Sequence, residues 1–363
     1  MPASKPPPRR PPARNTRSGN PAVRAATPKV PNAPTRQPRQ PAASRRFTPP
    51  IDDTNEVPPL DGASYPQLLR VPGSTAGRSL AGVGLAVLIF YIMSSVVSQL
   101  VVAVGYAIER QGTWPEFYRQ AFAFERPVGM LGANLGIAIA IPIAWALLAV
   151  LHRMRPRWLG SVQPGLRWRY LAICLPVAAV SLLGLQLLVS GLVPVHPQQG
   201  LAGFVVVILL TSPLQAAAEE ILFRGYLLQA LGSLVGRPWF GIVVSSVVFA
   251  LLHGTQNLPL FADRLAFGVV AALLVWRTGG LEAGIAAHVV NNILAFGLAG
   301  LTTSIATLRA VRQLSWAAAG VDVGSFALFA LLAYLVARAM RLRRTVDLAA
   351  VGGGGLGGDR SLQ

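Results

Sequence analysis

The sequence predicts an all-α membrane protein, a polytopic bundle of about eight transmembrane helices. Of its 363 residues, 53% are hydrophobic and only 13% are charged, and its mean hydropathy is +0.50. These values are typical of integral membrane proteins. Apolar runs of about 20 residues, long enough to cross a bilayer as a helix, recur from residue 80 onward. Basic residues gather instead at the N-terminus and between the runs.

Residues 1–78 are expected to form a disordered, cytoplasmic tail. They hold 13 Lys or Arg against 4 acidic residues, interleaved with prolines as in PPPRRPPAR. Such a segment buries too little apolar surface to offset its loss of chain entropy on ordering. A basic tail beside a membrane favours contact with anionic lipid headgroups. We therefore expect no nucleic-acid partner, RNA or ribosome contact being the less favoured alternative.

The apolar runs divide the rest of the chain. We expect N-terminal transmembrane helices over 79–200, a core over 201–300, a loop and last helix over 301–345, and a flexible Gly-rich tail over 346–363. The fifth to seventh runs are short or weakly separated, so seven spans are the alternative. The candidate spans are 80–107, 128–151, 170–194, 203–230, 239–257, 260–277, 281–300 and 323–341.

Arginine placement predicts the orientation of the bundle, because cytoplasmic loops carry an excess of basic residues. With eight spans, most loop arginines fall on the side of the basic N-terminus. The opposite loops have mixed charge, as around Arg110 and Arg119, and Arg309 and Arg312 are the clear exceptions. Both chain ends should therefore face the cytoplasm. The arginines on that side are Arg153, Arg155, Arg157, Arg167, Arg169, Arg237, Arg277, Arg338, Arg341, Arg343 and Arg344.

Ionisable residues within apolar runs indicate a functional site, because they are expensive in a membrane. The first group lies in AAAEEILFRG. Glu220 and Arg224 are four residues apart and can pair, whereas Glu219 points about 100° away. A desolvated, unpaired Glu219 could serve as a base. The alternative is that all three form a structural charge cluster.

Two further polar groups occur at a similar estimated depth. His253 ends FALLH, and His288 and Asn292 share a face of HVVNN, which also contains Asn291. At ~1.5 Å per residue, these groups and Glu219 lie roughly 10 to 21 Å from the cytoplasmic helix ends. Three helices thus place polar groups in one slab of the membrane.

A glutamate, two histidines and an asparagine suit hydrolysis by an activated water. Glu219, His253 and His288 could instead bind a divalent metal such as Zn²⁺. The metalloprotease signature H-E-x-x-H is absent, so no metal or other cofactor is expected. His152 and His196 lie at a helix end and in a loop, and we expect both to be solvated.

EEILFRG, FALLH and RTGGLEAGIAAHVVNN resemble, in order and spacing, the motifs E-E-x-x-x-R, F-x-x-x-H and H-x-x-x-N. These motifs mark the CAAX protease and bacteriocin-processing (CPBP/Abi) family of intramembrane endopeptidases. The resemblance covers roughly residues 200–300. It implies that Glu219 activates water with His253 as its partner, and that His288 and Asn292 stabilise the oxyanion. Glu220 with Arg224 would be structural.

The sequence therefore predicts a membrane protease that cuts a membrane-associated protein or peptide. A catalytically silent scaffold or immunity protein of the same family is the alternative, and a proton-coupled transporter is a third. The ratio of 30 Arg to 2 Lys suggests a bacterium, and hence the bacterial inner membrane. Pro213 lies six residues before Glu219, and a kink there could open a cavity, although membrane helices also tolerate proline.

Overall fold

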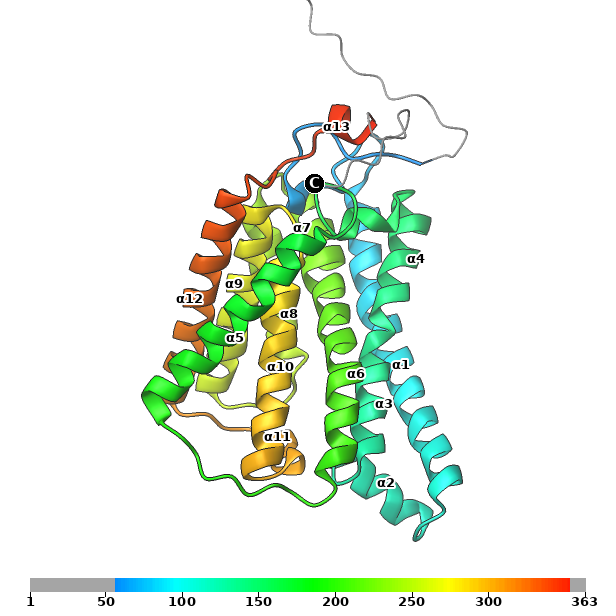
Figure 1. Ribbon diagram of the computed structural model, residues 1–363. Coiled ribbons are helices and arrows are strands. Elements are labelled where there is room, and N and C mark those ends of the chain that lie inside the picture. Colours follow the sequence, from blue (N-terminus) through cyan, green and yellow to red (C-terminus); the bar gives the residue numbers. More distant parts are fainter. Residues whose placement is uncertain (1–55, 353–363) are drawn as a thin grey trace, which may run out of the picture. The chain divides into compact units, whose positions relative to one another are not determined.

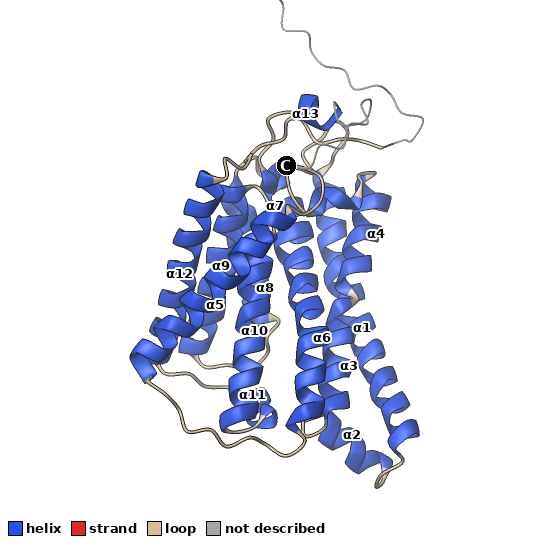
Figure 2. Cartoon of the chain, viewed as in Figure 1, coloured by secondary structure: helices blue, strands red, loops and turns tan. Residues whose placement is uncertain are grey.

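The computed structural model describes residues 56–352. All of these residues belong to one compact unit. The described part is built from helices and loops without a strand, as Figure 2 shows, so the predicted all-α fold is confirmed. Residues 1–55 and 353–363, where most of both tails is predicted, lie outside the described residues.

Thirteen α-helices, two short 3₁₀-helices and one π-helix follow one another between residues 56 and 352 (Figure 1). Three of these elements, α6, the π-helix η3 and α7, form a continuous helical stretch. In chain order the elements are η1 (Tyr65–Gln67), α1 (Ala76–Glu109), α2 (Trp114–Phe122), α3 (Pro127–Ala138), α4 (Ala140–His152), η2 (Pro156–Leu159), α5 (Trp168–Ser190), α6 (Leu201–Glu219), η3 (Glu220–Leu227), α7 (Leu228–Leu234), α8 (Pro238–Leu251), α9 (Leu258–Thr278), α10 (Glu282–Thr302), α11 (Ile305–Ala310), α12 (Trp316–Ala339) and α13 (Leu348–Gly352).

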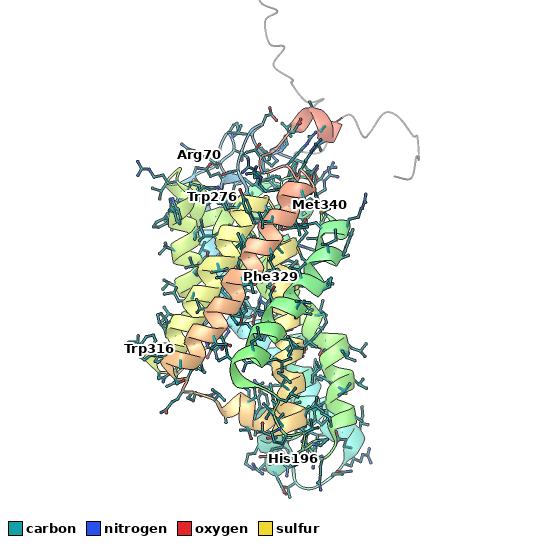
Figure 3. All side chains as sticks on the ribbon, turned by 60° about the vertical axis from the view of Figure 1, so that its left-hand side comes forward. Arg70, His196, Trp276, Trp316, Phe329 and Met340 are labelled. Carbon is teal, nitrogen blue, oxygen red and sulfur yellow. The ribbon has the colours of Figure 1, made fainter. Side chains whose placement is uncertain are left out.

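Within the described residues, seven helices are long and apolar enough to cross a membrane. They are α1, α3 with α4, α5, α6 through α7, α9, α10 and α12. Together with α8 they agree with the predicted count of about eight. In Figure 3, Arg70 and Met340 lie towards one end of the bundle, and His196 and Trp316 lie towards the other.

The fifth expected span, 239–257, is wrong in its length. Helix α8 ends at Leu251 after 14 residues. The chain then turns through Gly254, whose φ is +80°, into a loop that ends at Asn257. The Asn257 side chain accepts a hydrogen bond from the Leu260 amide at the start of α9 and donates to the Leu314 carbonyl. Helix α8 therefore stops short, and His253 lies in the turn that follows it.

Small residues allow close packing of the helices. An ideal Cβ added at Gly132 of α3 would lie 2.9 Å from the Ser98 carbonyl oxygen of α1, so a larger residue would separate these helices. Helix α10 packs against α5, α6 and α9. Its residues 282–290 are all buried, whereas residues 291–297 are only partly buried. The buried half of α10 thus forms the centre of the bundle.

The expected tail boundary at residue 78 is wrong for residues 56–78. Tyr65, Leu68 and Leu69 are fully buried in the main core, and Gln67 donates a hydrogen bond to the Gly236 carbonyl at 2.6 Å. Burial raises the pKa of Tyr65 well above its usual value, so its phenol remains neutral and donates to the Leu159 carbonyl. This short segment buries enough apolar surface to order itself against the bundle.

The flexible C-terminal tail was expected to begin at residue 346, but residues 346–348 are held by contacts with the N-terminal segment. Val346 is 3% exposed, and its backbone exchanges hydrogen bonds with Gly62 and Ala63. The Leu348 amide donates to the Asp61 carboxylate at 3.0 Å. Segments from the two ends of the described chain thus pair with each other, which a search for apolar runs does not reveal.

Candidate active site

The polar residues of the three motifs come from adjoining elements. Glu219 is the last residue of α6, and Glu220 begins η3. Helices α8 and α10 bring His253 and His288 to the same region, where the Phe249 ring lies 4.5 Å from the His253 ring and 6.2 Å from the His288 ring. The slab of polar groups expected from the sequence is therefore a cluster around Phe249.

The α-helical hydrogen-bond pattern changes at the EEILFRG motif. Residues 220–227 form a π-helix, in which each N–H bonds the carbonyl five residues earlier. Such segments are rare and are often found at functional sites. Helix α6 is α-helical through Pro213 up to Glu219. The departure from regular geometry thus lies at the glutamates and not at the proline.

Glu220 and Arg224 form the expected ion pair. Glu220 Oε1 lies 3.0 Å from Arg224 Nη1, and the two side chains are 0% and 1% exposed. The guanidinium carbon lies 4.0 Å from the centre of the Phe249 ring and 5.2 Å from that of Phe267. A charge pair so fully removed from water needs additional partners to offset its desolvation. Two aromatic faces supply part of that compensation through cation–π contact.

His288 lies between the two glutamates. Its Nε2 is 3.2 Å from Glu219 Oε2, and its Nδ1 is 2.9 Å from Glu220 Oε1. The expectation that Glu219 has no polar partner is therefore wrong. A neutral imidazole has only one N–H, so it can donate to both carboxylates only as imidazolium. With both glutamates ionised and Arg224 charged, that imidazolium makes the cluster electrically neutral.

The two glutamates differ in their access to the surroundings. The Glu219 side chain is 12% exposed, whereas the Glu220 side chain is fully buried between Arg224 and His288. An ideal Cβ at Gly284 of α10 would lie 2.8 Å from Glu220 Oε2. Helix α10 thus approaches Glu220 closely and covers it, and Glu219 is the carboxylate that a water molecule can reach.

His253 approaches the site from the turn after α8 and is exposed. Its Nδ1 lies 2.7 Å from the Phe249 carbonyl oxygen, which can only accept a hydrogen bond. Nδ1 therefore carries the proton in the neutral ring, and Nε2 is an acceptor. No direct hydrogen bond joins Glu219 to His253 within the described residues. A water molecule between them would agree with this arrangement.

Asn292 has a partner that the sequence analysis missed. Its Nδ2 donates to Gln215 Oε1 at 2.7 Å, and Gln215 is buried one turn before Glu219 on α6. Asn291 in turn donates to Asn292 Oδ1 at 3.3 Å. Gln215 shows the same signal as the other site residues, a polar side chain in an apolar run on the face of Glu219.

A second buried ion pair fixes the start of α10. Glu282 is fully buried, and its two oxygens accept hydrogen bonds from Arg167 Nε at 2.8 Å and Nη2 at 2.6 Å. This fork geometry is stronger and more directional than a single contact. The pair thus anchors the first turn of the helix that carries His288 and Asn292. Glu282 is present in the RTGGLEAG stretch, but its distant partner could not be read from the sequence.

The two histidines outside the motifs differ from each other. His196 is exposed, as expected. His152 is only 6% exposed, and its Nε2 lies 3.2 Å from the Tyr226 hydroxyl in η3. The expectation of a solvated His152 is therefore wrong, because the helix end on which it lies is covered by neighbouring elements.

The region that contains this cluster is similar to known proteins. Residues 201–294 match the family model of type II CAAX prenyl endopeptidase Rce1-like proteins. The core of this chain, residues 201–294, is thus similar to Rce1-like proteins. An uncharacterized protein of Bacillus subtilis (strain 168), YyaK, is 36% identical over 91 residues, which are 23% of this chain and 30% of that relative. The chain thus spans less than a third of that relative's length. No solved structure matches.

The Rce1-like core extends from α6 into α10 and contains every residue of the three motifs. The family resemblance inferred from those motifs is confirmed. With its apolar helices, the chain is an integral membrane protein. Helices α1 to α5 and α12 lie outside the matched core.

The geometry of the Rce1-like core does not fit a bound metal. Both ring nitrogens of His288 face glutamate oxygens, and His253 Nδ1 faces a backbone carbonyl. Between residues 56 and 352, no group of three or more His, Cys, Asp or Glu side chains has the arrangement of a metal site. The set Glu219, His253 and His288 would have to rearrange to coordinate Zn²⁺.

Proposed function

We propose that this chain is an intramembrane endopeptidase that hydrolyses a peptide bond of a membrane-associated protein or peptide. Its nucleophile would be a water molecule activated by Glu219. The observation that carries the proposal is the placement of His288 between Glu219 and Glu220 within an Rce1-like core. This cluster leaves one carboxylate accessible and holds the other as structural support.

In the proposed reaction, water lies between Glu219 and His253 Nε2. Glu219 takes a proton as the water oxygen attacks the carbonyl carbon of the scissile bond. The resulting oxyanion accepts hydrogen bonds from the Asn292 amide and from His288. Asn292 can serve because its NH₂ has two donors, of which Gln215 uses one.

Proton uptake by Glu219 would also prepare His288 for its role. While ionised, Glu219 accepts the His288 Nε2 proton as a hydrogen bond. Once Glu219 is a neutral acid, that interaction weakens and the N–H can turn to the oxyanion. The C–N bond then breaks, and Glu219 passes its proton to the leaving amine. The products are one new carboxyl terminus and one new amino terminus.

The proposal uses no metal or other cofactor. A chelator should therefore leave the cleavage rate of the purified chain unchanged, whereas loss of activity that added Zn²⁺ restores would contradict the metal-free mechanism. We also propose that both chain ends face the cytoplasm of a bacterium and that the protein lies in its inner membrane. The basic tail before residue 56, outside the described residues, would contact anionic lipids.

The test compares membrane-protein N- and C-termini in cells that contain the wild-type chain or the Glu219→Gln variant. Glutamine keeps the size and polarity of the side chain but cannot act as a base. Glu116→Gln, on the exposed surface of α2, is the matched control. We expect specific new termini with the wild type and the control, and none with Glu219→Gln at equal protein levels. Identical termini in all three would favour a catalytically silent scaffold.

A further inference from the structure

A separate pocket of about 220 Å³ lies between α5, α10 and α12. Polar side chains from all three helices line it: Gln186, Asn291, Asp322 and Ser325. Leu294 and Leu298 contribute apolar wall. In Figure 3, α12 is marked at Trp316 and Phe329, and Asp322 belongs to the helical stretch between them. Asp322 and Ser325 lie beyond residue 294 and therefore outside the Rce1-like core.

Asp322 has no cationic partner and no hydrogen bond within residues 56–352. The nearby Asp263 of α9 repels its charge, and the charge of Arg264 opposes that of Asp263. These three side chains together have one excess negative charge when ionised. An unpaired carboxylate within a membrane helix is costly and marks a functional site by default, and a cation that enters this pocket would offset its charge.

Asn291 connects the pocket to the proposed active site. It lines the pocket and donates to Asn292, which donates to Gln215 beside Glu219. Helix α10 therefore separates the two spaces, with Asn291 on one side and Asn292 on the other. A helix is roughly 10 Å across, and an extended peptide advances about 3.4 Å per residue. A substrate that enters both spaces must pass around this helix, so at least about three of its residues would lie between them.

We propose that this pocket is a substrate subsite that receives a lysine or arginine side chain, with Asp322 as its counter-charge. The proposal rests on the proposed protease function. The volume equals that of about seven waters in the liquid, which suits one long side chain and is below the roughly 300 Å³ of sites for drug-sized ligands. The basic residue would lie at least about three residues from the scissile bond.

The charge preference of the pocket can be measured without protease activity. Leu298 lines the pocket and is 40% exposed, and the single native cysteine, Cys174, is buried. The Leu298→Cys chain is reconstituted in lipid bilayers and treated with cationic trimethylammonium-ethyl or anionic sulfonatoethyl methanethiosulfonate. The wild-type chain measures background labelling. Each rate is divided by the rate of the same reagent with free cysteine.

We expect the corrected rate to be at least about tenfold higher for the cationic reagent. Adding Asp322→Asn should remove this preference. Adding Asp263→Asn, a neighbouring carboxylate that does not line the pocket, should leave most of it. Equal corrected rates for the two reagents, or a preference that Asp322→Asn does not change, would overturn the proposal even if the protease activity is established.

The predicted substrate preference is tested on the cleavage sites that are lost in the Glu219→Gln variant. These sites should carry Lys or Arg at one fixed position, and Asp322→Asn should reduce their cleavage about tenfold or more. Asp322→Arg should restore cleavage of a substrate whose basic residue is replaced by Glu. Glu219-dependent cleavage without a basic position would refute the subsite and leave the protease intact. Absence of any Glu219-dependent terminus would refute the protease, and the labelling would still decide the pocket's charge preference.

Discussion

At the scale of single residues, the site depends on how four charges share one buried space. Glu220 contacts both Arg224 and His288 Nδ1, whereas Glu219 contacts His288 Nε2 on the other side of the ring. The sequence could predict the Glu220–Arg224 pair, because residues four apart share a helix face. It could not predict that His288, 68 residues away, reaches both glutamates. That contact depends on how α10 packs against α6 and η3.

Replacing Arg224 by methionine should destabilise the fold. Methionine keeps much of the side-chain volume but leaves Glu220 buried without its strongest counter-charge, which typically costs about 3–5 kcal/mol. Adding Glu220→Gln removes the uncompensated charge, so the double variant should recover part of this loss. Thermal unfolding of the detergent-solubilised protein measures the effect. If Arg224→Met unfolds at the wild-type temperature, the pair is not the structural support described above.

At the scale of helices, the approach of α10 to η3 determines the site. The apolar runs predicted most helices, because a membrane requires about 20 apolar residues per crossing. They did not predict the early end of α8 or the π-helical turn. The apolar run of α8 continues through Leu252, one residue beyond the end of the helix, and the π-helix depends on packing that a hydropathy pattern does not contain.

The Gly284→Ala variant tests whether the close contact between α10 and η3 is needed for activity. An added Cβ would come within 2.8 Å of Glu220 Oε2, so either α10 or the carboxylate must shift. Gly297→Ala in the same helix is the control, since its Cβ would meet nothing within 4 Å. We expect Gly284→Ala to reduce the cleavage rate at least about tenfold, because a small misplacement of catalytic groups is costly. Gly297→Ala should keep wild-type activity, and equal effects of the two would contradict the close-approach argument.

At the scale of the whole molecule, the described chain closes one end of the bundle with segments from both of its own ends. Composition predicted a basic tail, and it misassigned residues 56–78 because prolines and arginines dominate the region's average. The buried side chains are few and irregularly spaced, so they form no periodic pattern. The contacts of η1 with α7, and the pairing of the segment with Val346, became apparent only in the structure.

Leu68→Ala tests whether this segment contributes to the fold. Removing a fully buried leucine side chain should lower the free energy of unfolding by about 2–5 kcal/mol. Leu60→Ala is the control within the same segment, because Leu60 is 47% exposed and should contribute less than about 0.5 kcal/mol. The two unfolding temperatures in detergent give the comparison. Equal values would mean that the segment packs without stabilising the bundle.

The central claim is that Glu219 activates water in a membrane-embedded protease. The most direct measurement is the cleavage rate of a bilayer-reconstituted chain, with chelator present, on a substrate found through its Glu219-dependent termini. We expect the wild type to cleave, and Glu219→Gln to be slower by about 10²–10⁴-fold with an unchanged unfolding temperature. Cleavage by Glu219→Gln at the wild-type rate would contradict the account.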